Sequence, residues 1–250
     1  MALAQPVALV TGAGRNIGRE IALALATTGH AVVVNVRTSL AEGQAVVDDI
    51  MARGGRALLC AADVGDRGAV AAMVERIGHE WGRLDVLVNN AAIRREAELS
   101  SLTAEDWHDT LRVVLDGAFF CSQAALPLLT ASPQATIVNV GGLTAHTGAA
   151  QRVHVVTAKA GLVGMTRALA HDLAAQGITV NCVAPGMIDT VRQASSASAS
   201  PKHHASRTTL LGRRGTALEV AQAVVFLAGD TARFVTGQVL HVNGGAYLGG

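Results

Sequence analysis

Short apolar runs rich in β-branched residues alternate along the chain with longer amphipathic stretches. Runs that are apolar throughout, rather than at every second position, are typical of strands buried on both faces of a parallel sheet. The runs are Val7–Val10, Ala31–Val36, Ala57–Cys60, Asp85–Val88, Thr136–Val140, Ile178–Val183 and Val239–Val242. The stretches with helical length and periodicity include Ile17–Thr28, Leu40–Arg53, Arg67–Trp81 and Val155–Ala174. The pattern predicts an α/β fold, a Rossmann-like doubly wound sheet of seven parallel strands with helices on both faces.

Length and composition fit a single domain over residues 1–250. Half of the residues are hydrophobic, 16% are charged and the formal net charge is +1, so we expect neither a nucleic-acid nor a membrane partner. A strand already begins at Val7, which leaves no room for a signal peptide, and no apolar run reaches the ~18 residues of a membrane span. Cys60, Cys121 and Cys182 lack the spacing of metal ligands and are expected to be free thiols in a reducing compartment. These features predict a soluble cytoplasmic protein.

One segment interrupts the alternation. Gln193–Ser206 is small and polar without any periodicity, so its burial cannot offset the entropic cost of ordering it. It follows the strand that ends near Val183, at the edge of the sheet where ligands bind in such folds. We therefore expect a mobile substrate lid at about 187–210, with a passive loop as the alternative. The pair His203-His204 has no carboxylate or cysteine nearby, so no metal site is expected.

A glycine-rich string, Gly12-Ala13-Gly14-Arg15-Asn16-Ile17-Gly18, joins the first predicted strand to the first predicted helix. In this setting glycines let the backbone approach a pyrophosphate, and the free N–H groups of the helix that begins near Ile17 point at the anion. The string therefore predicts a dinucleotide-binding site.

Further motifs follow in order, namely Asn89-Asn90-Ala91-Ala92, Ala158-Lys159-Ala160-Gly161 and Pro185-Gly186. Together with the glycine string, they resemble the short-chain dehydrogenase/reductase family over essentially the whole chain, and its 3-oxoacyl-[acyl-carrier-protein] reductase-like members in particular. The resemblance implies an NAD(P)-dependent oxidoreductase that acts on a small-molecule substrate. The cofactor-binding residues that it implies are Gly12, Arg15, Asn16, Ile17, Gly18, Arg37, Asp63, Val64, Asn90, Ala91, Lys159, Pro185, Gly186, Ile188 and Thr190.

Two features of the nucleotide site are particular to this chain. The family has a glycine where this chain has Asn16, but asparagine enters the left-handed region at low cost, so we expect the turn to be preserved. After the second strand an acidic residue would bind the ribose 2′-hydroxyl, whereas this chain has Arg37 and no carboxylate before Glu42. Similar proteins place Arg15 on the same side of the pocket, and two guanidinium groups favour a 2′-phosphate. We expect NADP(H) as the cofactor, with NAD(H) as the alternative.

Three of the family's four catalytic positions have lost their polar group. Members of the family donate a proton from a tyrosine four residues before the lysine, assisted by a serine and an asparagine. Here these positions are Val155, Gly142 and Val114, and only Lys159 is retained. A valine has no proton to donate. The single tyrosine of the chain, Tyr247, lies three residues from the C-terminus, where we expect a surface tail; the alternative is a tail that reaches the site of a neighbouring subunit.

Candidate catalytic residues to replace the tyrosine are Lys159, His154 and His146. Lys159 either binds the nicotinamide ribose alone or acts as the acid, because a neighbouring positive charge would lower its pKa. The two histidines lie close to the altered positions in the sequence, and histidine titrates near neutrality. His154 projects ~100° around the helix from Val155, so it reaches the same point only if the helix start is shifted.

The sequence leaves three hypotheses open. The first is an NADP(H)-dependent oxidoreductase that transfers a hydride to a carbonyl or imine with a non-standard proton donor. The second is a catalytically inactive, nucleotide-binding regulatory or partner subunit, and the third is a lyase or isomerase that uses the same pocket. By the resemblance, the apolar stretches Val113–Leu129 and Val155–Ala174 are expected to form the interfaces of a homotetramer, or of a homodimer.

Overall fold

The structure is a computed structural model, and it describes residues 5–190 and 208–249. Its centre is a parallel sheet of seven strands in the order β3-β2-β1-β4-β5-β6-β9. The strands are β1 (Val7–Val10), β2 (Ala31–Val36), β3 (Ala57–Ala61), β4 (Val86–Asn89), β5 (Thr136–Val140), β6 (Thr179–Pro185) and β9 (Val239–Val242). The chain runs from β1 to one edge of the sheet and then from β4 to the other, so the predicted doubly wound sheet is confirmed.

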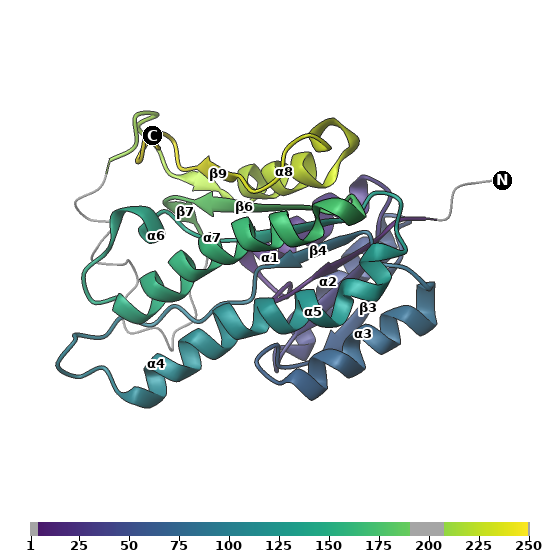
Figure 1. Cartoon of the computed structure of the whole chain (residues 1–250), viewed down its shortest axis with the longest axis horizontal. Helices are drawn as coiled ribbons and strands as arrows, with labels where there is room; N and C mark the ends of the chain where they lie inside the picture. Colours follow the sequence, from purple (N-terminus) through teal and green to yellow (C-terminus); the bar gives the residue numbers. More distant parts are fainter. Residues whose placement is uncertain (1–4, 191–207, 250) are drawn as a thin grey trace.

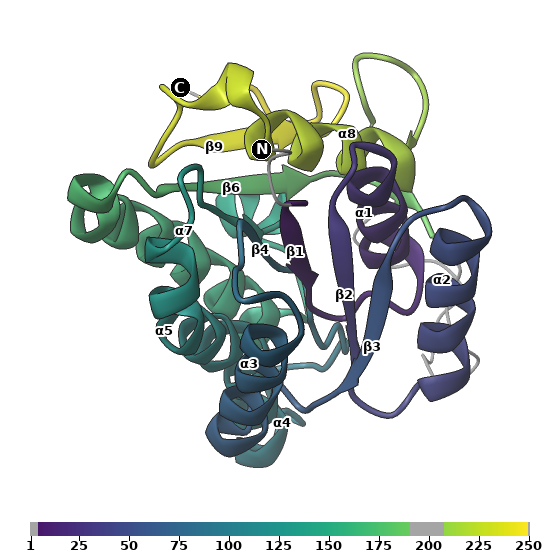
Figure 2. The ribbon, with the colours of Figure 1, turned by 90° about the vertical axis from the view of Figure 1, so that its right-hand side faces the viewer.

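Helices cover both faces of this sheet (Figure 1). Figure 2 shows α1, α2 and α8 on one face and α3, α5 and α7 on the other. The helices are α1 (Asn16–Thr27), α2 (Leu40–Ala52), α3 (Arg67–Trp81), α4 (Ala104–Leu111), α5 (Gly117–Thr130), α6 (Thr144–Thr147), α7 (Val153–Leu173) and α8 (Ala217–Ala228). Alternate strand residues face the two layers, with Val10 and Val34 in one core and Leu9 and Val33 in the other. Both faces are therefore buried, which is why the strands are apolar throughout.

The expectation that no apolar segment is long enough to cross a membrane is wrong for the longest helical stretch. A π-helical turn, η1 (Arg112–Asp116), joins α4 to α5. Judged by length and composition alone, the resulting run Ala104–Thr130 could cross a membrane. Core helices of soluble proteins pass the same test. Because α5 packs on α3, and both α4 and η1 pack on α7, the run is part of the helical layer of the sheet.

Two short strands close the segment in which the lid is predicted. β7 (Ile188–Asp189) pairs with β8 (Gly215–Thr216), and Arg214 Nε lies 2.7 Å from the Asp189 carboxylate. We call the paired strands β7 and β8, together with the start of α8, the neck. Residues 191–207, which make up most of the predicted lid, lie outside the described residues.

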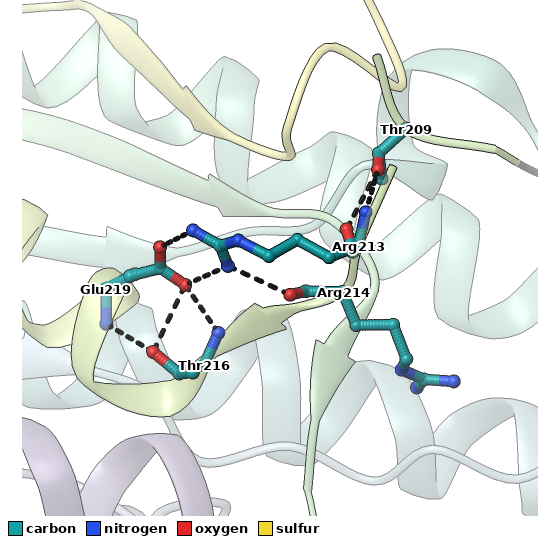
Figure 3. Close-up of polar contacts among 5 residues, drawn as sticks. All are labelled: Thr209, Arg213, Arg214, Thr216 and Glu219. Carbon is teal, nitrogen blue, oxygen red and sulfur yellow. Dashed lines mark hydrogen bonds and ion pairs between the residues drawn. The ribbon is translucent and has the colours of Figure 1, made fainter. Parts of the chain in front are cut away.

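Within the neck, a network of polar contacts connects β8 and the chain before it to the first turn of α8 (Figure 3). Thr216 and Glu219 form a capping box, in which each side chain bonds the backbone N–H of the other residue. Arg213 Nη2 lies 2.5 Å from the Glu219 carboxylate. The backbone N–H of Arg213 donates to Thr209 Oγ1 at 3.1 Å. The helix start, the strand pair and the returning chain are thus fixed together.

Candidate nucleotide and substrate site

The motifs of the sequence meet where the order of the strands reverses. β1 and β4 are neighbours in the sheet, and ligands of doubly wound sheets bind beyond the carboxyl ends of such strands. Asn90, which follows β4, donates from Nδ2 to the carbonyl oxygens of Thr11 at 2.8 Å and Gly12 at 3.1 Å. The Asn90 side chain therefore holds the glycine string in place.

The glycine string has the shape of a pyrophosphate cradle. A Cβ on Gly18 would lie 2.3 Å from the Gly12 carbonyl oxygen, and a Cβ on Gly12 would lie 3.0 Å from Ala91 Cα. Asn16 has a φ of 51°, which confirms that this asparagine takes the left-handed conformation. Since α1 begins at Asn16, the free N–H groups of its first turn lie beside the string. These residues fit a dinucleotide whose pyrophosphate is held by backbone N–H groups.

Charged side chains gather beyond β2 and β3, where the adenosine half of a dinucleotide would lie. Arg37 Nη1 lies 3.8 Å from Asp63 Oδ2, and Arg112 Nη1 donates to the same oxygen at 3.2 Å. Burial acts to raise the pKa of Asp63, but hydrogen bonds from the Gly65 N–H and Arg112 outweigh it, so this pKa is lowered. Asp63 is thus ionised and oriented, and both Arg37 and Arg15 are exposed to solvent beside the cradle.

Arg112 is a site residue that the sequence did not predict. It begins the π-helical turn η1, a type of turn that is common at functional sites but has no signal in a pattern of helical period. The same turn contains Val114, the residue expected at the family's asparagine position, and it is 2% exposed. Val114 packs with Ala158 and Leu162. The turn therefore carries a small apolar cluster at the position where the sequence predicts the loss of a polar group.

Lys159, the one residue retained among the four expected catalytic positions, is buried. Its side chain is 4% exposed, and Nζ donates to the carbonyl oxygen of Val140 at 2.5 Å. The pKa of Lys159 is lowered to about 7, mainly by burial; repulsion from Arg94 and Arg152 acts in the same direction, while Cys182 opposes the shift. A lysine with such a pKa exchanges protons readily at neutral pH, which makes it suitable for acid–base chemistry.

The two remaining altered positions differ in the space around them. A Cβ added to Gly142 would meet no atom within 4 Å, so this position opens into free space. Val155 is one helical turn before Lys159 and is 3% exposed. The predicted serine position, Gly142, is thus open, whereas the predicted tyrosine position is filled by the packed side chain of Val155.

His154 lies in a different environment from its neighbour Val155. It is completely buried, and neither ring nitrogen has a hydrogen-bond partner within the described part of the chain. Burial lowers the pKa of His154; Arg152 lowers it further, and Asp106 of α4 opposes this. The ring is therefore neutral and lies within reach of the charges of α4.

His146 belongs to a cluster of three rings. Its ring centroid is 4.6 Å from that of His241 in β9 and 5.6 Å from that of Tyr247 in the C-terminal tail. The three side chains line a cleft of about 750 Å³, together with residues of α7. Burial lowers the pKa of His146, and Arg167 adds to the effect. The structure thus places His146 beside Tyr247 of the same chain.

The last group of predicted cofactor residues lies at the carboxyl end of β6. The Pro185 carbonyl accepts the N–H of Leu143 at 2.8 Å, which joins β6 to the loop after β5. Gly186 approaches Asn243 so closely that a Cβ would lie 2.7 Å from the Asn243 Cα. The other predicted residues are Val64 and Ile188, which are buried, and Thr190, which is half-buried.

Comparisons with known proteins agree with this geometry. A family profile described as enoyl-(acyl carrier protein) reductase matches residues 12–247. The 3-oxoacyl-[acyl-carrier-protein] reductase FabG of Staphylococcus aureus is 40% identical over 242 residues, which cover 96% of this chain and 98% of the relative. The (2S)-[(R)-hydroxy(phenyl)methyl]succinyl-CoA dehydrogenase subunit BbsD of Thauera aromatica is 41% identical over 248 residues, 99% of each chain. The crystal structure of a short chain dehydrogenase from Burkholderia cenocepacia J2315 in complex with NADP matches with a TM-score of 0.89 and 38% identity, over 97% of this chain and 98% of that one.

Proposed function

Because the chain belongs to the short-chain dehydrogenase/reductase family, we propose that it is an NADP(H)-dependent oxidoreductase that reduces a carbonyl or imine without the family's usual tyrosine. The observation that carries this proposal is the state of Lys159. It is buried and bonded to the carbonyl of Val140, two residues before the open Gly142 position, and its pKa is about 7. A group with these properties can take over proton transfer where the tyrosine position holds Val155.

NADP(H) is the cofactor that best fits the residues present. Gly12, Gly18 and the start of α1 would hold the pyrophosphate, and Arg15 and Arg37 would hold the 2′-phosphate. The structurally similar protein from Burkholderia cenocepacia was solved in complex with NADP. When bound, NADPH would supply the hydride. NAD(H) is the weaker alternative, because no carboxylate follows β2 to bind a ribose 2′-hydroxyl.

Lys159 would supply the proton for a carbonyl substrate. Its ammonium group donates one proton to the carbonyl oxygen as the carbonyl carbon accepts the hydride, so the product is the alcohol. The neutral amine that remains takes a proton back from solvent. An iminium substrate already carries the positive charge and becomes an amine on hydride addition alone, in which case Lys159 acts only through its position.

The nucleotide part of the proposal is tested by fluorescence titration with NADPH and with NADH. We expect NADPH to bind at least tenfold more tightly, and the double substitution R15A/R37A to remove this preference, because the 2′-phosphate loses both guanidinium groups. Arg53→Ala is the matched control, since Arg53 is also exposed but lies at the far end of α2. If neither nucleotide binds, the oxidoreductase proposal fails.

A second function, a catalytically inactive nucleotide-binding partner subunit, is favoured by the way two altered positions are filled. Val155 and Val114 are 3% and 2% exposed and form part of the packed interior. The relative from Thauera aromatica is itself named a dehydrogenase subunit. A partner subunit would bind NADPH but oxidise none with any carbonyl or imine when assayed alone. In that case the double substitution V155Y/G142S, which restores the family's tyrosine and serine, should create NADPH-dependent reduction of a ketone. The open space at Gly142 accepts the serine side chain.

We also infer a homotetramer, with a homodimer as the alternative, and a cytoplasmic location. The apolar face of α5 is partly exposed, with Phe119 at 45%, and α7 exposes Thr157, Ala160 and Gly164 along one side. Faces of this kind are suited to pairing with a second copy of the chain. The three cysteines are free and buried, which fits a reducing compartment.

A further inference from the structure

One edge of the sheet is formed by β9 (Figure 2). Leu240 and Val242 of this strand pack into the core below α8, so the alternate residues Val239 and His241 point to the opposite face. On that face α7 covers the neighbouring strand β6, and in the described part of the chain no helix follows β9 to cover it in turn. A cleft of about 750 Å³ therefore lies between the second half of α7 and the edge of the sheet.

This cleft extends away from the nucleotide site. Its walls include Arg167 and His171 of α7 and residues 236–239, which lead into β9. Arg167 follows Lys159 by eight residues, which is about 12 Å along the helix axis. Because α7 runs back from the carboxyl ends of the strands, this part of the helix lies toward their amino ends, away from the glycine string. The cleft is therefore a second place at which a small molecule can bind.

The charged and titratable side chains around the cleft are basic. Arg167 and His171 are exposed and lie one helical turn apart, and within the described ranges neither side chain forms a hydrogen bond or an ion pair. His146 and His241 line the cleft from α6 and β9, and no carboxylate is among its described lining residues. A cleft lined by one sign of charge concentrates ions of the opposite sign. These side chains therefore favour an anionic ligand.

Two ring nitrogens in the walls of the cleft lack a partner. His146 Nε2 and His241 Nδ1 are buried, and no described residue forms a hydrogen bond with either atom. Burial lowers the pKa of both histidines, so each ring is neutral and has one N–H to donate. The ring of Tyr247, whose centroid is 5.0 Å from that of His241, completes an aromatic wall. Unpaired buried polar atoms are typical of places that hold a further bound group, and a flat ring packs well on an aromatic wall.

We propose that this cleft is a second ligand site, which binds a small aromatic acid. The anionic group of the ligand lies at Arg167 and His171, where the guanidinium donates two parallel hydrogen bonds to a carboxylate or a phosphate ester. Its ring lies against the aromatic wall, and a volume of about 750 Å³ is within the range of small-molecule sites. The inference does not rest on the proposed redox chemistry, because neither Lys159 nor the glycine string lines the cleft.

The test compares naphthoate with naphthylmethanol, which has the same ring and no charge, by calorimetric titration of the protein with and without saturating NADPH. We expect naphthoate to bind about tenfold more tightly than the alcohol, because only the acid accepts charge-assisted hydrogen bonds. Arg167→Met should reduce that ratio to about one, and His171→Glu, which adds a negative charge at an exposed position, should reduce it as well. Tyr247→Ala should weaken both probes and keep the ratio, since it removes a ring and no charge. NADPH should leave the affinity for naphthoate unchanged.

The matched control is Arg53→Met, an exposed arginine at the end of α2 on the other face of the sheet, and it should keep the wild-type ratio. Equal binding of the two probes by the wild type would overturn the inference, as would an unchanged ratio in Arg167→Met or displacement of naphthoate by NADPH. Absence of binding to the wild type, as when a second copy of the chain covers the cleft, would overturn it too. Tighter binding of naphthyl phosphate than of naphthoate would support the site and identify the acidic group as a phosphate ester.

Discussion

Lys159 shows how burial sets the chemistry of one residue. Its Nζ is paired with a backbone carbonyl rather than a carboxylate, so little offsets the cost of keeping the charge inside the protein. Its pKa therefore falls from 10.5 to about 7. Between these values the unfolded chain binds more protons at this site than the folded chain, so the residue lowers stability below pH 7 and less so as pH rises toward 10.5.

If Lys159 is the proton donor, kcat for carbonyl reduction falls with rising pH, about tenfold per unit above the pKa near 7, because the ammonium form disappears. Lys159→Met should reduce kcat at least 100-fold and remove this limb of the profile. Steady-state kinetics from pH 5.5 to 9 would measure both effects. The same variant should raise the melting temperature at pH 7, since an uncompensated buried charge is removed.

His146→Gln and His154→Gln test the other two candidates in the same assay. A histidine variant that lost the pH-dependent limb while Lys159→Met kept it would transfer the role to that histidine. Full turnover in all three variants would show that none of them donates the proton.

Several of these residue properties could be read from the sequence. The left-handed Asn16 was predictable because few residues other than glycine and asparagine suit that position. The lowered pKa of Lys159 was also predictable in direction, although burial rather than a neighbouring charge is its main cause. The contact of Arg112 with Asp63 was not, because it depends on a π-helical turn, for which local sequence carries no signal.

Among the elements, the neck holds the first turn of α8 in place through the contacts of Arg213, Thr216 and Glu219 (Figure 3). The hydrogen bond from Arg213 is the main reason that the pKa of Glu219 falls to about 2, with the Thr216 N–H as the second contributor. Since the unfolded value is 4.5, the contribution to stability is complete above pH 4.5 and is lost as the pH falls through 2.

Glu219→Gln should lower the melting temperature at pH 7 by a few degrees, because it weakens both the capping box and the pair with Arg213. The difference from wild type should narrow as the pH is lowered from 4.5 toward 2. Thermal melts followed by circular dichroism measure this, with Glu42→Gln in the first turn of α2 as the control. An equal effect of the two substitutions would argue against a special role for the capping box.

The sequence located most elements but not those that depend on distant contacts. β1, β2, β5, β9 and α3 have the predicted bounds, because each is a continuous apolar or amphipathic run. β7 and β8 have two residues each, and they form because residues far apart in the sequence, 188–189 and 215–216, pair with one another. The box Thr216–Glu219 does have a sequence signature, a threonine followed three residues later by glutamate, which could have identified the start of α8.

For the whole molecule, the exposed apolar side of α5 leads to a prediction about assembly. Phe119→Asp should convert the wild-type oligomer to a smaller species, because a charge in the centre of a helix-pairing face remains unpaired. Size-exclusion chromatography with light scattering measures the mass. Leu99→Asp is the control, since Leu99 is 79% exposed on the loop after β4. A monomeric wild type would refute the proposed homotetramer and homodimer together.

The neck also has a consequence for how this protein can change. Because β7 and β8 are bonded to each other and Arg214 joins Asp189, the two described ends that flank the intervening segment are held side by side. The entropy of closing a loop between such points grows slowly, by about 0.6 kcal/mol for each doubling of its length. Insertions, deletions and whole-segment exchanges between residues 190 and 208 should therefore leave the strand register untouched. Directed evolution of substrate range can accordingly treat this segment as a replaceable cassette, with libraries of variable length built on an unaltered nucleotide site.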